Sequence, residues 1–391
     1  MVDSYIRTEL LSKNPYFCDE DNARSLAAIL WETLAAHGTD RDVAALIGII
    51  EVANSIEGGV LPYVLRNGPQ DARDTLLGSA DRVGYDYGEN PLDRQKTGFV
   101  AEWFCWCMST LLNHDAVIHP AEHGGKNRFH LISPIPAADE SLRTVGASTG
   151  GGEFPQHSDA TVYHEMRDRT DLDRALTRLG TDVDAVAEIL ERDPDTIYDQ
   201  VLCGMFVRVD MTILAGVLNL ETMTHVALPG PLEAHLRAHG LSSGDIHTLA
   251  NMPTAHLAGP ADGDISGYVG NICPPLYLGS RGELLGSCIN SAPRRMIYVG
   301  RNPEHARLFE RFIDLVRSVP VSAVLMQPGD YLFLPNAYFY ENSNVTHGRG
   351  QLSDTEYNIP IANGKVGRRI HCRQYAVSRS RSGLPSFLST L

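Results

Sequence analysis

Short strand-like segments separated by turns fill the chain from residue 127 onward, and they restrict its possible folds more than any other feature. Each is rich in β-branched, aromatic or aliphatic residues and is bounded by Gly, Pro, Asn, Asp or Ser. The segments lie at 128–134, 142–145, 224–228, 294–299, 322–327, 331–334, 338–342 and 369–377. Many short strands of this kind, with helices before and between them, predict a distorted β-barrel or sandwich backed by helices, an α+β fold class.

Helical periodicity is strongest in the first third of the chain. Apolar residues recur at helical spacing in 19–37 and 42–56, while 99–112 is apolar on all sides and is predicted to be a buried helix. Further helices are predicted at 170–190, 195–200, 231–239 and 303–316. The apolar segment 201–220 is compatible with a strand or a helix, because its periodicity favours neither.

These patterns predict one domain spanning residues 1–391. Residues 1–125 would form a helical N-terminal layer and residues 126–377 a β core. The core would carry a helical insertion at 170–198 and a loop-like lid at 242–286, a segment rich in Gly, Pro, Asp and Ser. Loops of that length in a compact domain usually have a function.

Composition narrows the choice of partners and compartment. A net charge of −15 argues against nucleic acid and anionic membranes as partners. The seven cysteines show no disulfide spacing, and Cys105-x-Cys107 lies in an aromatic run typical of a buried core. With no signal peptide and no membrane span of about 20 apolar residues, we expect a cytoplasmic protein. The sequence leaves the oligomeric state open.

A histidine and an aspartate one residue apart, His157-Ser158-Asp159, follow a Gly-rich run that begins at Gly150. If this tripeptide lies at a strand end, both side chains point to the same side, because strand side chains alternate. They could then occupy two positions around a metal ion. A distant third histidine would complete a 2-His-1-carboxylate site of the kind that non-heme Fe(II) oxygenases use. The tripeptide alone is equally compatible with a polar turn.

Three further motifs follow in a set order near the C-terminal end. They are Gln327-Pro-Gly-Asp-Tyr-Leu-Phe-Leu-Pro-Asn336, Thr346-His347-Gly348-Arg349, and Gly367-Arg-Arg-Ile-His-Cys-Arg-Gln-Tyr375. Together with His157-x-Asp159, this order resembles the Fe(II)/2-oxoglutarate-dependent oxygenases, in particular the clavaminate synthase-like group. That group includes amino-acid hydroxylases such as arginine and lysine hydroxylases. The resemblance implies a double-stranded β-helix (jelly-roll) core and the use of Fe(II), 2-oxoglutarate and O2.

The resemblance also implies roles for individual residues. His157, Asp159 and His347 would bind Fe(II) and form the catalytic centre. Arg369 would bind the distal carboxylate of 2-oxoglutarate; Arg368 is the alternative, and only one of these neighbours can point inward. Thr212 would help to hold 2-oxoglutarate. Arg373 would face the carboxylate of the substrate. The long separation between Asp159 and His347 is assigned to the insertion at 170–198 and the segment 242–286.

The expected reaction is hydroxylation of an unactivated C–H bond of an L-amino acid, coupled to decarboxylation of 2-oxoglutarate to succinate. The presence of Asp159 disfavours halogenation, since halogenating relatives have Gly or Ala there. A basic substrate of the lysine or arginine type is expected. The residues that could contact it are Ser148 or Thr149 for the α-carboxylate, Gln156 for the amino group, and Glu165, Asp262 or Asp264 for a side-chain cation. Any one of these acids could instead be a solvated surface residue.

Four alternatives remain. The same chemistry could act on another free or carrier-bound amino acid, or it could end in desaturation or cyclisation. Gly146-Ala-Ser148-Thr-Gly150 matches the Gly-x-Ser-x-Gly motif of serine hydrolases, but it runs into Gly and Pro instead of a helix. A cupin-like metal-binding barrel without catalysis is the fourth, and the basic residues suited to a second carboxylate ligand argue against it.

Overall fold

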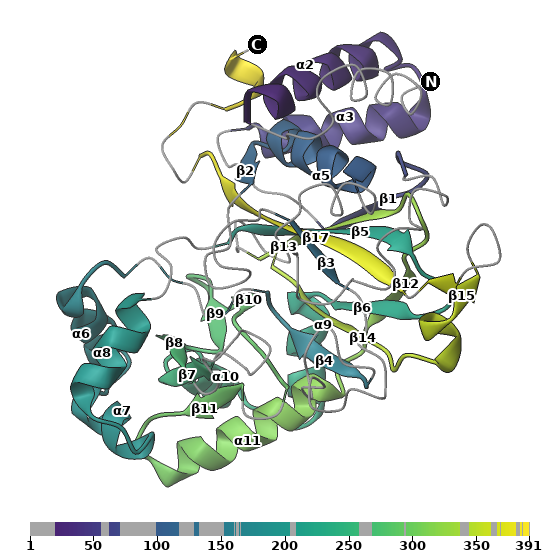
Figure 1. Cartoon of the computed structure of the whole chain (residues 1–391). Helices are drawn as coiled ribbons and strands as arrows, with labels where there is room; N and C mark the ends of the chain where they lie inside the picture. The colour runs from purple at the N-terminus through teal and green to yellow at the C-terminus, as the bar shows by residue number, and fades with distance from the viewer. Residues whose placement is uncertain are drawn as a thin grey trace.

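Two antiparallel sheets and a layer of helices surround the candidate residues in the computed structural model of the chain (Figure 1). The structure describes residues 20–55, 62–70, 99–116, 129–132, 152–159, 161, 164, 166–203, 209–257, 268–292, 295–336, 344–360, 366–367, 369–380, 384 and 386–390. The predicted strands at 142–145 and 338–342 lie outside these ranges.

The larger sheet has the strand order β1-β13-β5-β17-β2, and β3 also pairs with β17. Its strands are β1 (Tyr63–Leu65), β2 (His114–Ala116), β3 (Phe129–Ile132), β5 (Met211–Leu218), β13 (Tyr331–Pro335) and β17 (Ile370–Ser378). Every residue of β5 is buried. Such burial on both faces explains why periodicity could not distinguish strand from helix in 201–220, where the structure shows a strand at 211–218.

Three helices cover the outer face of this sheet, as the upper part of Figure 1 shows. They are α2 (Glu20–Ala36), α3 (Arg41–Ala53) and α5 (Phe99–Leu111), which confirm the helices predicted at 19–37, 42–56 and 99–112. Asp40 caps α3 by accepting hydrogen bonds from the backbone N–H groups of Asp42 and Val43. Buried side chains of α5, including Trp103 and Met108, pack in one apolar cluster with residues of β5, β13 and β17.

The smaller sheet has the order β12-β6-β14-β4. Its strands are β4 (Phe154–His157), β6 (Met223–Ala227), β12 (Ser322–Leu325) and β14 (Thr346–Arg349). Another apolar cluster joins β5 and β13 of the larger sheet to β6 of the smaller one, through Leu214, Leu332 and Val226. The odd-numbered residues of β5 from Met211 to Val217 pack on the helix side. Because strand side chains alternate, Thr212 shares the face of Leu214 and points toward the smaller sheet.

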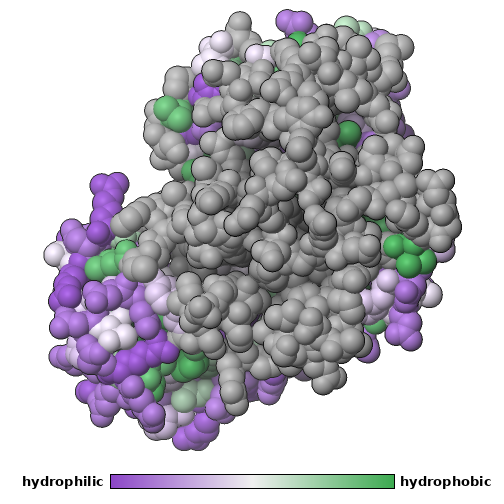
Figure 2. All heavy atoms as spheres, viewed as in Figure 1, coloured by the Kyte–Doolittle hydropathy of each residue, from purple (hydrophilic) through white to green (hydrophobic). Residues whose placement is uncertain are grey.

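The region predicted as a helical insertion contains α6 (Arg169–Arg178), α7 (Val183–Ile189) and α8 (Pro194–Cys203). The continuous helix expected at 170–190 is broken at Gly180, whose φ of +72° suits glycine. Asp182 then caps α7 by accepting a hydrogen bond from the N–H of Ala185. Hydrophilic side chains gather over these helices in the lower left of Figure 2, as expected for charged amphipathic helices.

The expectation of a loop-like segment at 242–286 is wrong for most of the residues that the structure describes there. The structure places there α10 (Ser243–Leu249), β7 (Thr254–Leu257), β8 (Val269–Cys273), β9 (Leu276–Leu278) and β10 (Leu284–Ser287). β7 pairs with β8 and with β11 (Met296–Tyr298), and β9 pairs with β10. The Gly and Pro residues here separate very short strands, and composition alone does not distinguish that from a loop. Residues 258–267 of the lid expected at 242–286 lie outside the described ranges.

The remaining elements complete the described part of the chain. They are α9 (Pro229–Ala238), α11 (Pro303–Arg317), η5 (Asp354–Tyr357), β15 (Ile359–Pro360), β16 (Val366–Gly367) and η7 (Leu388–Thr390). α9, α10 and α11 share an apolar cluster with β9 and β10. Among the helices of the described ranges, none has the length and hydrophobicity needed to cross a bilayer.

Candidate metal centre

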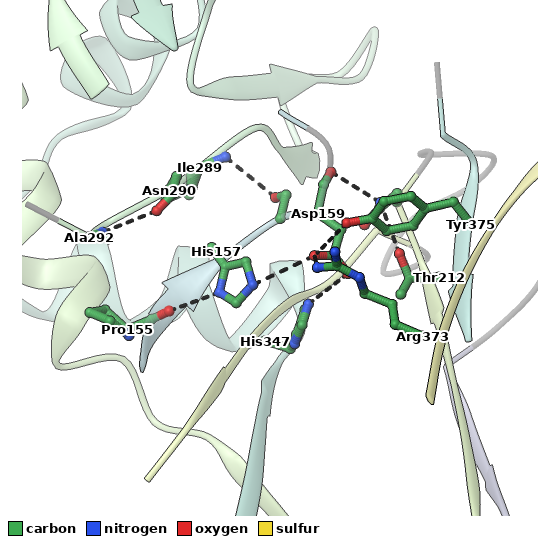
Figure 3. Close-up of polar contacts among 12 residues, drawn as sticks. Pro155, His157, Asp159, Thr212, Ile289, Asn290, Ala292, His347, Arg373 and Tyr375 are labelled. Carbon is green, nitrogen blue, oxygen red and sulfur yellow. Dashed lines mark hydrogen bonds and ion pairs between the residues drawn. The ribbon is translucent and has the colours of Figure 1, made fainter. Parts of the chain in front are cut away.

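His157, Asp159 and His347 meet between β4 and β14 (Figure 3). His157 and His347 are directly paired across the two strands. The Nε2 atom of His347 lies 3.0 Å from Oδ2 of Asp159, and Nε2 of His157 lies 3.6 Å from Oδ1 of the same carboxylate. All three side chains are buried, and one potential ligand atom of each lies within 4.8 Å of the others. Two imidazoles and one carboxylate therefore converge on one point.

Backbone contacts orient His157 toward this point. Its Nδ1 lies 2.9 Å from the carbonyl oxygen of Pro155. Since a carbonyl oxygen only accepts, Nδ1 carries the proton, and the lone pair of Nε2 is left on the side of Asp159. Protein ligands of metal ions are commonly fixed by a hydrogen bond of this type.

The electrostatics favour the forms of these side chains that bind metal. Burial alone would raise the pKa of Asp159, but His347, His157 and Arg373 together hold that pKa well below its usual range. Burial, followed by the charge of His347, lowers the pKa of His157. Asp159 is thus ionised and His157 is neutral at neutral pH. An ionised carboxylate with imidazoles fits Fe(II).

Hydrogen bonds on both sides fix the backbone that carries Asp159. The side-chain amide of Asn336 donates to the carbonyl oxygen of Asp159 at 3.1 Å and to Oγ1 of Thr212 at 3.3 Å. The N–H of Ser158 donates to the carbonyl oxygen of Ile289 at 2.6 Å. Thr212, which is fully buried, is thereby connected to the metal centre from the neighbouring sheet.

Arg369 lies just before β17 and is 3% exposed. Its Nε donates to Oδ1 of Asn219 at 3.1 Å, and its terminal nitrogen donates to Nδ1 of His371 at 3.0 Å. Burial, followed by the neighbouring Arg349, lowers the pKa of Arg369 to about 9. Burial and the same two arginines hold the pKa of His371 well below its usual range. The carboxylate of Glu356 offsets only part of this lowering, so the buried guanidinium favours an anionic ligand.

β17 sends alternate side chains to its two faces. Ile370, Cys372 and Ala376 pack in the cluster on the helix side. Arg373 and Tyr375 lie on the other face, beside Asp159 (Figure 3). A guanidinium nitrogen of Arg373 lies 3.7 Å from Oδ1 of Asp159, and the hydroxyl of Tyr375 donates to that oxygen at 3.4 Å. The alternation places Arg369 on the same face as Arg373; Arg368 lies outside the described ranges.

Two residues of the site were missed in the sequence. Glu356 of η5 is fully buried, and its carboxylate accepts hydrogen bonds from the backbone N–H groups of residues 220–222. Its carbonyl oxygen accepts from the N–H of Arg369 at 2.7 Å. Because its bonding partners are up to 136 positions away, no local pattern could identify it. Arg349, 5% exposed, could have been identified, because it lies two residues after His347 on the same strand.

Of the residues expected to contact the substrate from β4 and the loops, the structure describes only Gln156. Gln156 precedes His157 in β4, so its side chain points to the opposite face, where its Oε1 accepts a hydrogen bond from Thr346 at 3.1 Å. This placement gives no support to a contact with substrate. The others all lie outside the described ranges: Ser148, Thr149, Glu165, Asp262 and Asp264.

No protein-family model matches the sequence, and no curated protein sequence matches it. Solved structures do match. Non-heme iron oxygenase OrfP, in complex with Fe, succinate and (3R,4R)-dihydroxy-L-Arg, aligns with a TM-score of 0.57 at 16% identity over 97% of this chain and 94% of that chain. Asparagine oxygenase, in complex with Fe(II), 2S,3S-3-hydroxyasparagine and succinate, aligns with a TM-score of 0.56 at 14% identity over 99% of this chain and 94% of that chain.

The chain therefore has the fold of these non-heme iron oxygenases. Its helices and antiparallel sheets confirm the predicted α+β class, and the match extends over nearly the whole length of both chains.

Proposed function

We propose that this protein is an Fe(II)/2-oxoglutarate-dependent oxygenase that hydroxylates an L-amino acid. The observation that carries the proposal is the convergence of His157, Asp159 and His347, buried and within 4.8 Å of one another. The shared fold with iron oxygenases supports it independently. We further infer that the two sheets form the double-stranded β-helix that the sequence resemblance implied, with the metal ligands on the smaller sheet.

Three protein ligands leave three positions of an octahedral ion open, and 2-oxoglutarate needs two of them. Arg369 would bind the distal carboxylate of 2-oxoglutarate, because its guanidinium is buried and has a planar, bidentate donor set. Arg349 adds positive charge nearby, and Thr212 would contribute a hydroxyl. When bound, iron and 2-oxoglutarate would supply the O2-activating chemistry that is coupled to release of succinate.

The substrate is proposed to be a basic amino acid of the arginine or lysine type. Arg373 is proposed to receive its α-carboxylate, since it lies on the metal-facing side of β17 next to Asp159. Support also comes from OrfP, which has been solved with hydroxylated L-arginine. Asparagine oxygenase has been solved with hydroxyasparagine, so a neutral amino acid is the second candidate. Ser148, Thr149, Glu165, Asp262 and Asp264 remain proposed contacts.

Two other classes of protein, serine hydrolases and metal-binding barrels without catalysis, receive less support than the oxygenase. A serine hydrolase of the α/β type needs a mainly parallel sheet, whereas the strand pairs in the described ranges are antiparallel. A metal-binding barrel without catalysis would need no buried arginine for the second carboxylate of an organic ligand, which is the role proposed for Arg369. Desaturation or cyclisation would use the same metal centre as hydroxylation, and only the product would differ.

The test is a panel of L-amino acids incubated with the protein, Fe(II), ascorbate, O2 and 2-oxoglutarate, with succinate as the readout. We expect substrate-stimulated succinate with arginine or lysine, and a product one oxygen atom heavier than the substrate. The matched control is Asp159→Ala, which should lose the stimulation. If lysine and arginine are both inert, the basic substrate is ruled out; if Asp159→Ala retains full turnover, the oxygenase assignment is ruled out.

A further inference from the structure

A second group of metal-ligand side chains lies away from the proposed iron centre. His256 belongs to β7, Cys273 ends β8, and Cys288 follows β10. One ligand atom of each lies within 4.8 Å of the other two. The register of the sheet explains part of this: Cys273 pairs with Thr254 and Asn271 pairs with His256, so Cys273 and His256 are diagonal neighbours on one face.

The imidazole of His256 is the most informative member of the group. It is 0% exposed, and beyond the neighbouring thiol of Cys273 neither ring nitrogen has a hydrogen-bond partner among the residues that the structure describes. The hydroxyl of Thr254, on the same face of β7, is likewise buried without a partner in the described ranges. Buried imidazoles almost always have a hydrogen bond or a metal ion, because an unsatisfied polar ring is costly. A ligand positioned between the two sulfurs would remove that cost.

A side-chain amide contacts one of the two sulfurs. The side-chain amide of Asn271 donates to Sγ of Cys273 at 3.5 Å. Amide donors to a coordinating sulfur are a common feature around bound metal ions.

We propose that His256, Cys273 and Cys288 form a second metal site, for zinc, that is separate from the iron centre. Two thiolates and an imidazole are the ligands that select zinc, while iron of the oxygenase type prefers imidazole and carboxylate. Tetrahedral zinc places two sulfurs about 3.8 Å apart, which is compatible with ligand atoms that all lie within 4.8 Å of one another. The fourth position would be taken by water, because the described residues supply three ligands.

Bound zinc would cross-link three segments that lie in or next to short strands. It would link β7 and β8 to the end of the β9–β10 hairpin. The same Asn271 that contacts Cys273 also donates to the carbonyl oxygen of Thr161, two residues after Asp159, at 3.1 Å. The zinc site would therefore stabilise the segment that follows an iron ligand without taking part in the reaction.

Cobalt(II) substitution tests this proposal with a readout that the iron centre cannot produce. The full-length protein is stripped of metal under reducing, anaerobic conditions and titrated with Co(II). A cobalt–thiolate bond gives a near-ultraviolet charge-transfer band, whereas the His157–Asp159–His347 centre contains no sulfur. We expect the band to saturate at one equivalent per chain in Asp159→Ala and at no more than two in the wild type, whose iron centre also takes up Co(II), and we expect its loss in Cys273→Ser and Cys288→Ser. Cys105→Ser, in α5, is the matched control and should keep the band.

A second measurement does not depend on how the variants fold. Zn(II) should abolish the cobalt band in the wild type and should protect Cys273 and Cys288, but not other reactive thiols, from alkylation as detected by peptide mass spectrometry. A wild type without the band would overturn the proposal, as would alkylation of both thiols at the same rate with and without Zn(II). Recovery of a Cys273–Cys288 disulfide from protein that binds no Co(II) after reduction would assign the pair to redox chemistry instead.

Discussion

Asp159 is the residue on which the metal centre depends most. It contacts both histidines and Arg373, and it supplies the only negative charge of the proposed ligand set. In the absence of metal, its burial is a cost that the two imidazoles and Arg373 offset. Removing the charge should therefore abolish metal binding without unfolding the protein.

We predict that Asp159→Asn lowers Fe(II) affinity by roughly 100-fold or more, because an amide is a poor substitute for a ligating carboxylate. Anaerobic calorimetric titration with Fe(II) measures this directly. The melting temperature of the metal-free variant should fall, because the two imidazoles and Arg373 lose a buried anionic partner, so the comparison of Fe(II) affinities is made below the melting temperature of both proteins. Asp115→Asn, at a partly exposed ion pair with Arg379, is the control and should bind Fe(II) normally. Unchanged affinity in Asp159→Asn would contradict the ligand assignment.

Arg369 should determine the affinity for 2-oxoglutarate. We predict that Arg369→Met weakens 2-oxoglutarate binding by about 2–5 kcal/mol, the usual cost of removing one partner of a buried charged pair. Arg369→Lys should recover only part of that loss, because an ammonium cannot form the bidentate contact. Titration of the Mn(II)-loaded protein with 2-oxoglutarate gives both values. Arg379→Met removes another buried arginine and should leave binding intact; an equal effect there would show that Arg369 acts through folding alone.

At the scale of elements, the close approach of β4 and β14 sets the geometry of the centre. A Cβ atom at Gly348 would lie 2.6 Å from the carbonyl oxygen of Phe154 and 2.9 Å from Nε2 of Gln156. Any larger residue would push apart the two strands that pair His157 with His347. Gly350, two residues on, has no such restriction: its nearest neighbour would be His225 at 3.7 Å.

We predict that Gly348→Ala lowers Fe(II) affinity by roughly tenfold or more, because a small displacement of one ligand is enough to disturb a fixed coordination geometry. Gly350→Ala is the matched control and should behave as the wild type. Both variants are compared by Fe(II) titration and by circular dichroism, so that a loss of metal can be distinguished from a loss of fold. Equal Fe(II) affinities in the two variants would argue against strand spacing as the determinant.

The sequence predicted elements well where one face is clearly apolar and poorly where both faces are buried or the strands are very short. The helices at the N-terminal end and at 303–316 are amphipathic or apolar over several turns, and they were identified. The strand at 211–218 was left ambiguous because neither face meets water, and β7 to β10 were mistaken for a loop. Glu356 and Asn219 depend on partners distant in sequence, which no local pattern records.

At the scale of the whole molecule, buried neutral histidines link stability to pH. Burial lowers the pKa of His114, His164 and His371, so these rings stay neutral in the folded state when they would be protonated in the unfolded chain. The unfolded state then binds more protons below its ordinary pKa of about 6.5. Stability is therefore fully present above that pH and is lost as the pH falls below it.

We predict that the free energy of unfolding of the metal-free protein decreases between pH 7 and pH 5. Each histidine that remains neutral when folded contributes a slope approaching about 1.4 kcal/mol per pH unit. Urea unfolding at several pH values measures the slope. His114→Gln, which removes one such group far from the proposed ligands, should reduce the slope whatever its effect on overall stability. An identical slope would show that His114 takes up its proton in the folded state.

The most direct test of the central claim is anomalous X-ray scattering at the iron edge from anaerobic crystals grown with Fe(II) and 2-oxoglutarate. We expect one iron peak bounded by Nε2 of His157, Nε2 of His347 and the carboxylate of Asp159, with the guanidinium of Arg369 on the far carboxylate of 2-oxoglutarate. An iron peak at any other place, or 2-oxoglutarate bound away from Arg369, would contradict it.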